Sequence, residues 1–141
     1  MIECKKVFLD TTPIIYFLDE DMNFGNKVES ILSEIIENEI EMATSTITCM
    51  EYLTYPYKMG NTEKINAFFD FVKDCDIPLY SIGEEVAKKA AQIRAEYKVF
   101  KAMDALQLAT ACLTGCDLFL TNDKQLRQFG EIMCITVEEL E

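Results

Sequence analysis

Short apolar runs alternate with longer segments of helical periodicity along this chain. Runs of strand length lie at residues 6–9, 40–44, 77–80, 117–120 and 132–135. Between them, apolar residues recur at helical spacing in residues 12–18, 25–38, 46–56, 62–72, 84–98 and 102–114. Strands that alternate with helices predict an α/β fold with a central parallel β-sheet of about five strands.

Threonine, proline and glycine mark the expected ends of several elements. Thr12 has the features of a helix N-cap, with Pro13 at the first helical position. The helix after the second strand is expected to end near Pro56. Gly115 is placed to close the last long helix, and Pro78 indicates that the third strand lies at a sheet edge.

The composition predicts one domain over residues 1–141. Half of the 141 residues are hydrophobic, which is enough for a core. No segment approaches the roughly 18 consecutive apolar residues of a membrane helix, and the first residues lack the apolar stretch of a signal peptide. Six scattered cysteines form no paired C-x-x-C units. We therefore expect a cytoplasmic protein without a membrane partner.

The chain contains no histidine. Every mechanism that takes an imidazole from this chain is thereby excluded, including Ser-His-Asp hydrolysis and histidine-based cleavage of RNA. The net charge of −12, from 13 basic and 25 acidic residues, argues against the basic footprint of most nucleic-acid binders. It also fits a carboxylate-rich pocket that binds a cation before it meets a phosphate.

Four carboxylates are predicted to converge at one edge of the sheet. Asp10 directly follows the first strand, and Asp123 follows the fourth. Glu51 lies in the helix after the second strand, and Asp104 lies in the first turn of the helix before the fourth. Ligands of open α/β sheets bind beyond the carboxyl ends of the strands, so these side chains can share one site.

An oxygen-only site of this kind indicates a hard metal ion. Clustered carboxylates repel one another unless a cation lies between them, and a set without His or Cys selects Mg²⁺ or Mn²⁺. Such an ion can activate water and hold a phosphodiester for displacement. Thr12 and Thr121 can place hydroxyls near the ion or its waters, and Asn122 can orient a phosphate or a carboxylate.

Each acid also has a purely structural interpretation. Asp10 and Asp123 can each cap the short helix that follows. Glu51 comes three residues after Thr48, which is the spacing of a capping box, and Asp104 suits a helix N-terminus because of the helix dipole. Capping explains each acid singly, but it explains their joint placement at one edge less well.

Two groups of cations flank the acidic set and are candidates for contact with an RNA backbone. They are Arg94, Lys98 and Lys101, which lie close to one helical face, and Lys124 and Arg127, which follow Asp123. A solvated helix flank explains the first group at least as well.

The ordered set of motifs resembles the PIN domain family, and more narrowly its VapC-type toxins. The resemblance covers nearly the whole chain. It rests on the D-T-T motif at residues 10–12, on Glu51, on the helical D-A-x-x-x-A-T-A motif at residues 104–111 and on the T-N-D turn at residues 121–123. A single one of these motifs would be weak, but the set at these separations is specific.

The resemblance implies a three-layer PIN-like fold in which helices flank the sheet. It implies an endoribonuclease that uses Mg²⁺ or Mn²⁺ through the quartet Asp10, Glu51, Asp104 and Asp123. It also implies an RNA substrate, a homodimer, and an antitoxin whose peptide tail covers the site. Thr12 stands where many members have Ser or Asn, a mild departure that leaves metal binding intact.

Two other functions stay open at this point. A phosphatase similar to haloacid dehalogenases would use Asp10 as its nucleophile, but Thr12 occupies the place of the expected second aspartate. A PIN-like scaffold that binds RNA or a partner without catalysis is the other alternative, although all four acids are present. Replacing Asp10 or Asp104 by Asn separates these interpretations.

Overall fold

Five parallel strands form one central sheet in the computed structural model, which describes residues 2–140. The strands are β1 (Lys6–Leu9), β2 (Glu41–Ser45), β3 (Leu79–Tyr80), β4 (Leu118–Thr121) and β5 (Met133–Thr136). Their order in the sheet is β3-β2-β1-β4-β5, and every neighbouring pair is parallel. Strand order therefore reverses between β1 and β4, which is where ligands bind in folds of this kind.

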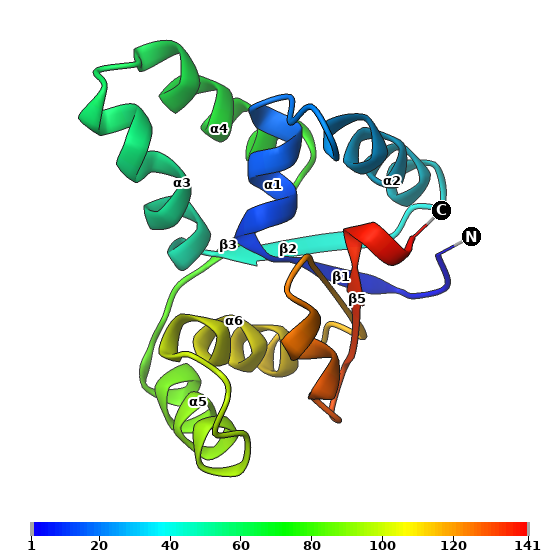
Figure 1. Cartoon of the computed structure of the whole chain (residues 1–141), viewed down its shortest axis with the longest axis vertical. Coiled ribbons are helices and arrows are strands. Elements are labelled where there is room, and N and C mark those ends of the chain that lie inside the picture. The colour runs from blue at the N-terminus through cyan, green and yellow to red at the C-terminus, as the bar shows by residue number, and fades with distance from the viewer. Residues whose placement is uncertain (1, 141) are drawn as a thin grey trace.

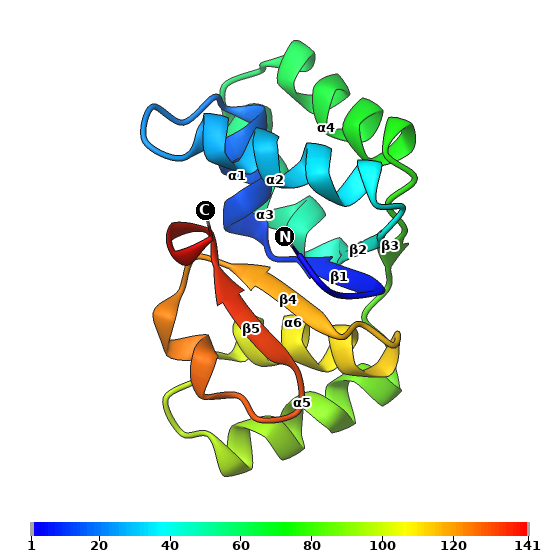
Figure 2. The same cartoon turned by 90° about the vertical axis from the view of Figure 1, so that its right-hand side faces the viewer.

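Helices cover both faces of the sheet and make a three-layer molecule. The helices are α1 (Thr11–Leu18), α2 (Gly25–Glu37), α3 (Thr46–Lys58), α4 (Thr62–Asp74), α5 (Glu84–Glu96) and α6 (Ala102–Leu113). Figure 1 shows α1 to α4 on one side of the sheet and α5 and α6 on the other, and Figure 2 shows the same division from the side. Two single-turn helices, η1 (Lys124–Gln128) and η2 (Val137–Glu139), flank β5. The three-layer α/β fold expected from the sequence is confirmed.

The sheet separates two hydrophobic clusters. Val7 and Leu9 of β1 belong to the cluster under α1 to α4, whereas Phe8 belongs to the cluster under α5 and α6. Successive side chains of a strand point to opposite faces, so a strand that is covered on both faces needs apolar residues at every position. This requirement explains why the central strands are continuous apolar runs in the sequence.

The predicted strands agree with the observed ones to within two residues at each end. Pro78 precedes β3, which lies at the sheet edge as predicted. Gly115 follows the end of α6 with a φ of 79°, a conformation that favours glycine. Thr12 as the N-cap of α1 is wrong. Asp10 is the cap, because its side chain accepts a hydrogen bond from the Thr11 N–H.

The helix expected to end near Pro56 continues two residues further, to Lys58. A proline inside a helix removes one backbone hydrogen bond. Here Leu53 and Pro56 are both buried on the inner side of α3, and that packing offsets the lost bond. Among residues 2–140, no helix is long and apolar enough to cross a membrane.

Candidate functional site

Asp10 lies at the carboxyl end of β1, at the point where strand order reverses. Its backbone N–H donates to the Leu120 carbonyl at 2.9 Å, which extends the pairing of β1 with β4 by one residue. The side chain is only 8% exposed. One carboxylate oxygen accepts from the Thr11 N–H at 2.9 Å, and the other accepts from the Thr121 hydroxyl at 2.8 Å. Asp10 is therefore held rigidly by its neighbours on β1, β4 and α1.

The ionised form of Asp10 is costly in this position. Burial raises the pKa of the carboxyl to about 6, and the negative charges of Asp104 and Glu51 add to the rise. The hydrogen bonds from Thr121 and the Thr11 N–H act in the opposite direction but do not compensate. A cation at the site would remove this penalty.

Asp104 lies in the first turn of α6 and is partly buried. Burial raises its pKa, and the charge of Asp123 is the next cause, followed at a lower level by Glu51. The charge of Lys101, at the N-cap position of α6, opposes the rise. Asp104 therefore lies within electrostatic reach of the other three acids, as the sheet-edge argument predicts.

Asp123 follows β4 and is the N-cap of η1, where its side chain accepts from the Gln125 N–H at 3.0 Å. Its own N–H donates to the Thr121 hydroxyl at 3.1 Å. Because the same hydroxyl donates to Asp10, Thr121 links the two strand-end aspartates. The structural interpretation of Asp123 as a cap thus holds, and it is compatible with a place in the acidic set.

Glu51 projects from α3 and is mostly exposed. The capping-box interpretation is wrong, because the N-cap of α3 is Ser45, not Thr48. One carboxylate oxygen of Glu51 accepts instead from the hydroxyl of Thr11 at 2.7 Å. Thr11, which the sequence analysis passed over in favour of Thr12, therefore supplies the hydroxyl that contacts an acid of the set.

The chemistry of this donor set fits a magnesium or manganese ion. Carboxylate and hydroxyl oxygens are the ligands that these ions prefer, and the raised pKa values of Asp10 and Asp104 reveal uncompensated negative charge. Within residues 2–140, however, no three acidic or cysteine side chains are already grouped closely enough to hold a metal ion. Charge effects reach much further than a metal–oxygen bond of about 2.1 Å, so a bound ion would draw the acids together around those that hydrogen bonds already hold in place.

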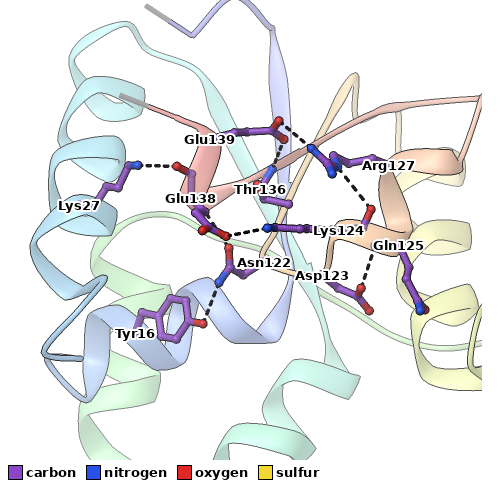
Figure 3. A network of polar contacts seen from close by, with 10 residues as sticks. All are labelled: Tyr16, Lys27, Asn122, Asp123, Lys124, Gln125, Arg127, Thr136, Glu138 and Glu139. Carbon is purple, nitrogen blue, oxygen red and sulfur yellow. Dashed lines mark hydrogen bonds and ion pairs between the residues drawn. The ribbon is translucent and has the colours of Figure 1, made fainter.

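The Asn122 side chain forms hydrogen bonds to two other segments of the protein. Its amide nitrogen donates to the Tyr16 hydroxyl at 3.0 Å, and its amide oxygen accepts from the Glu138 N–H at 3.3 Å. Figure 3 shows the side chain lying between α1 and η2. Asn122 thereby joins the loop after β4 to the C-terminal turn.

The cations of the first group do not share a helical face. Because α5 ends at Glu96, Lys98 and Lys101 lie in or at the end of the connection to α6, so the spacing argument for Arg94, Lys98 and Lys101 is wrong. The cause is Tyr97, which leaves the helical conformation as its ring packs against Phe100 and Phe129, with ring centroids 4.8 and 5.5 Å away. Lys101 nevertheless lies near Asp104.

The cations of the second group are paired with acids of the C-terminal turn. Lys124 lies 3.4 Å from Glu138, and Arg127 lies 3.3 Å from Glu139 (Figure 3). All four side chains are substantially exposed, with exposed fractions between 39% and 61%. Such pairs contribute little stability, so a phosphate backbone would displace them at small cost.

Several polar residues next to the acids were not predicted. They are the buried side chains of Thr11, Thr44, Ser45, Thr48 and Gln107. Their sequence signal is a run of small hydroxyl residues where β2 passes into α3, together with one glutamine inside the apolar α6. These residues lie at buried positions of a strand and of three helices, where apolar side chains are the rule, and this departure could be read from the sequence.

The comparisons with known proteins concern the family and the fold. The PIN domain family matches residues 7–132 of the chain. No match to the sequence is found among curated proteins. Solved structures of similar fold include proteins from three organisms. The structure of VapBC2 from Rickettsia felis bound to a promoter DNA fragment has a TM-score of 0.76 at 14% identity, and covers 93% of this chain and 98% of that chain.

A toxin-antitoxin complex from Klebsiella pneumoniae has a TM-score of 0.72 at 22% identity, over 95% of this chain and 99% of that chain. FitAcB from Neisseria gonorrhoeae gives the same TM-score of 0.72, identity of 22% and coverage of 95% and 99%. At these identities the likeness concerns the fold. The family match extends over most of the sheet and includes all four acids, so the chain belongs to the PIN domain family.

Proposed function

We propose that this protein is a Mg²⁺- or Mn²⁺-dependent endoribonuclease whose catalytic set is Asp10, Glu51, Asp104 and Asp123. One observation carries the proposal. Four acids from four separate elements lie close enough at one sheet edge for their charges to contribute to the raised pKa values of Asp10 and Asp104. Capping alone gives no reason for this costly concentration of charge.

The residues of the chain have distinct roles in this proposal. Asp10, buried and held by hydrogen bonds, and Glu51, exposed on α3, would both serve as ligands of the ion. A bound Mg²⁺ or Mn²⁺ supplies a Lewis acid that activates water and offsets phosphate charge. Thr121 keeps Asp10 and Asp123 in a fixed relation, since its hydroxyl contacts both residues. The phosphatase alternative has the weaker support, because Thr12 occupies the place of the expected second aspartate.

Metal-dependent cleavage of RNA tests the proposal directly. Cleavage of total RNA is expected with Mg²⁺ or Mn²⁺ and not with EDTA. Asp104→Asn should lower the rate at least about 100-fold, because it removes one carboxylate from the site. Asp117→Asn is the matched control. Asp117 precedes β4 at the opposite edge of the sheet, where it accepts from the Lys5 and Lys6 N–H groups. RNA cleavage that survives Asp104→Asn would support the non-catalytic scaffold instead.

Lys101 is proposed to contact the RNA backbone beside Asp104. Replacing it by Met should weaken RNA binding and reduce the slope of log K against log salt by about 0.7, the value for one contact with a single strand. Lys88→Met provides the control, because Lys88 is exposed on α5 and pairs only weakly with Glu84 at 3.5 Å. Filter binding across a salt series measures both slopes. Equal slopes for the two variants would remove Lys101 from the interface.

The partner proposals rest on a similar structure and on the family resemblance. The Klebsiella pneumoniae structure is a toxin-antitoxin complex, so we propose that this chain is the toxin of such a pair. The resemblance to VapC-type toxins adds the proposal of a homodimer. A short neighbouring gene that encodes a DNA-binding protein would support the antitoxin. Light scattering that finds only a monomer at high concentration would exclude the homodimer.

A further inference from the structure

A cluster of uncharged polar side chains lies buried beneath the acidic site. Its members are at most 5% exposed and come from α1, β2, α3 and α6: Thr11, Thr44, Ser45, Thr48 and Gln107. No buried side-chain nitrogen or oxygen among residues 2–140 lacks a hydrogen-bond partner. A buried polar network is costly unless it is fully satisfied, and a satisfied one holds its members in a single arrangement.

The orientation of the Gln107 amide follows from its neighbours. Its oxygen accepts from the Ser45 hydroxyl, and its nitrogen donates to the Thr48 hydroxyl at 2.8 Å. The same nitrogen lies 3.4 Å from a carboxylate oxygen of Asp10. With the amide turned over, an oxygen would face that carboxylate, so the charge of Asp10 favours the observed orientation.

A chain of hydrogen bonds runs from Gln107 to Glu51. The Thr48 and Thr11 hydroxyls are 3.0 Å apart, and the Thr11 hydroxyl lies 2.7 Å from Glu51. An amide nitrogen only donates and an ionised carboxylate only accepts. Each hydroxyl has one proton, and that of Thr11 goes to Glu51, which can only accept. Thr48 accepts from Gln107 and, at 2.9 Å, from the Thr44 hydroxyl. Its own proton is therefore left for Thr11. The donor at Gln107 and the acceptor at Glu51 therefore require the same donor-to-acceptor direction along this series of hydrogen bonds.

We propose that Gln107 is a positioning residue that, through Thr48 and Thr11, fixes the carboxylate of Glu51. Glu51 is exposed on α3, and without this chain its side chain would sample several rotamers. An uncharged amide suits this role. A lysine or arginine in its place would pair with the carboxylates and weaken their attraction for a cation, whereas Gln107 orients them and leaves their charge available. The inference rests on the proposed function in one respect, the role of Glu51 as a metal ligand.

Manganese affinity tests the inference without relying on catalysis. Thr48→Val keeps the shape of the side chain but removes the hydroxyl, and should weaken Mn²⁺ binding at least about 10-fold, the usual effect of losing a group that orients a ligand. Thr48→Ser retains the hydroxyl and should restore wild-type affinity. Thr110→Val is the control, since Thr110 is equally buried on α6 but its hydroxyl donates to the Leu106 carbonyl, outside the cluster. Free Mn²⁺ is followed by electron paramagnetic resonance.

The outcomes separate this inference from the proposed function. Wild-type protein that binds no Mn²⁺, or binding that is insensitive to Asp104→Asn, would overturn both. Asp104-dependent binding with a Thr48→Val affinity within about two-fold of wild type would overturn the inference alone. If Thr48→Val does not fold, Thr11→Val breaks the same chain one step nearer Glu51 and should give the same loss of affinity.

Discussion

Replacing Asp10 by Asn is expected to stabilise the metal-free protein by about 3 kcal/mol at neutral pH and to abolish cleavage of RNA. A carboxyl whose pKa rises from 3.8 to about 6 on folding destabilises the folded state by roughly this amount once it is ionised. The amide retains an acceptor for the Thr11 N–H and brings no charge into a buried position. Urea unfolding in EDTA measures the gain.

The gain should depend on pH and on metal. Because folding raises the pKa of Asp10, the folded protein binds a proton more tightly than the unfolded chain, so wild-type stability falls as the pH rises from about 4 to 6. The difference from the variant is therefore largest above this window and closes below it. Mg²⁺ should stabilise the wild type more than the variant, since it binds the folded state. A variant that is less stable than the wild type at neutral pH would contradict the cost assigned to Asp10.

Replacing Phe119 by Ala should destabilise the protein by about 3–5 kcal/mol. The Phe119 ring stacks on Phe8 of the neighbouring strand, with ring centroids 5.2 Å apart and an angle of 4° between the planes. Both side chains are fully buried. The strands they join, β1 and β4, lead directly to Asp10 and Asp123, so the loss would loosen the base of the acidic site. Urea unfolding at neutral pH measures the change.

Phe69→Ala is the matched control for this prediction. It removes the same ring from α4, where the side chain is 42% exposed. Only part of the apolar area is then lost from the core, and the expected destabilisation is below about 1.5 kcal/mol. Equal losses of unfolding free energy in the two variants would show that the stacked rings of β1 and β4 contribute no more stability than a partly exposed ring.

The apolar pattern predicted the strands well because the sheet is covered on both faces. Residues 7–9 and 118–120 are apolar at every position, which only a doubly covered strand requires. The ends of helices were harder to predict. Asp10 and Thr12 both have side chains that can cap a helix. Which of them is the N-cap depends on where the extended backbone of β1 turns into α1. Pro56 and Tyr97 act against expectation because tertiary packing outweighs local propensity.

The acids of the site were accessible from the sequence because topology alone places them. Residues after parallel strands meet at one edge, whatever the details of packing. The hydroxyl chain from Gln107 was not accessible in this way. Serine, threonine and glutamine have many structural uses, and their contacts depend on the distance between α3 and α6. The pairing of Lys124 and Arg127 with Glu138 and Glu139 depends likewise on the path of the chain after β5.

The acidic set is divided equally between the two layers of helices. Asp10 and Glu51 belong to elements that pack into the first hydrophobic cluster, whereas α6, with Asp104, and η1, which follows Asp123, pack into the second. Neither layer holds more than half of the set. A chain still leaving the ribosome, with α6 and β4 not yet made, therefore has no complete site. The acidic set is therefore complete only once both helical layers have folded against the sheet.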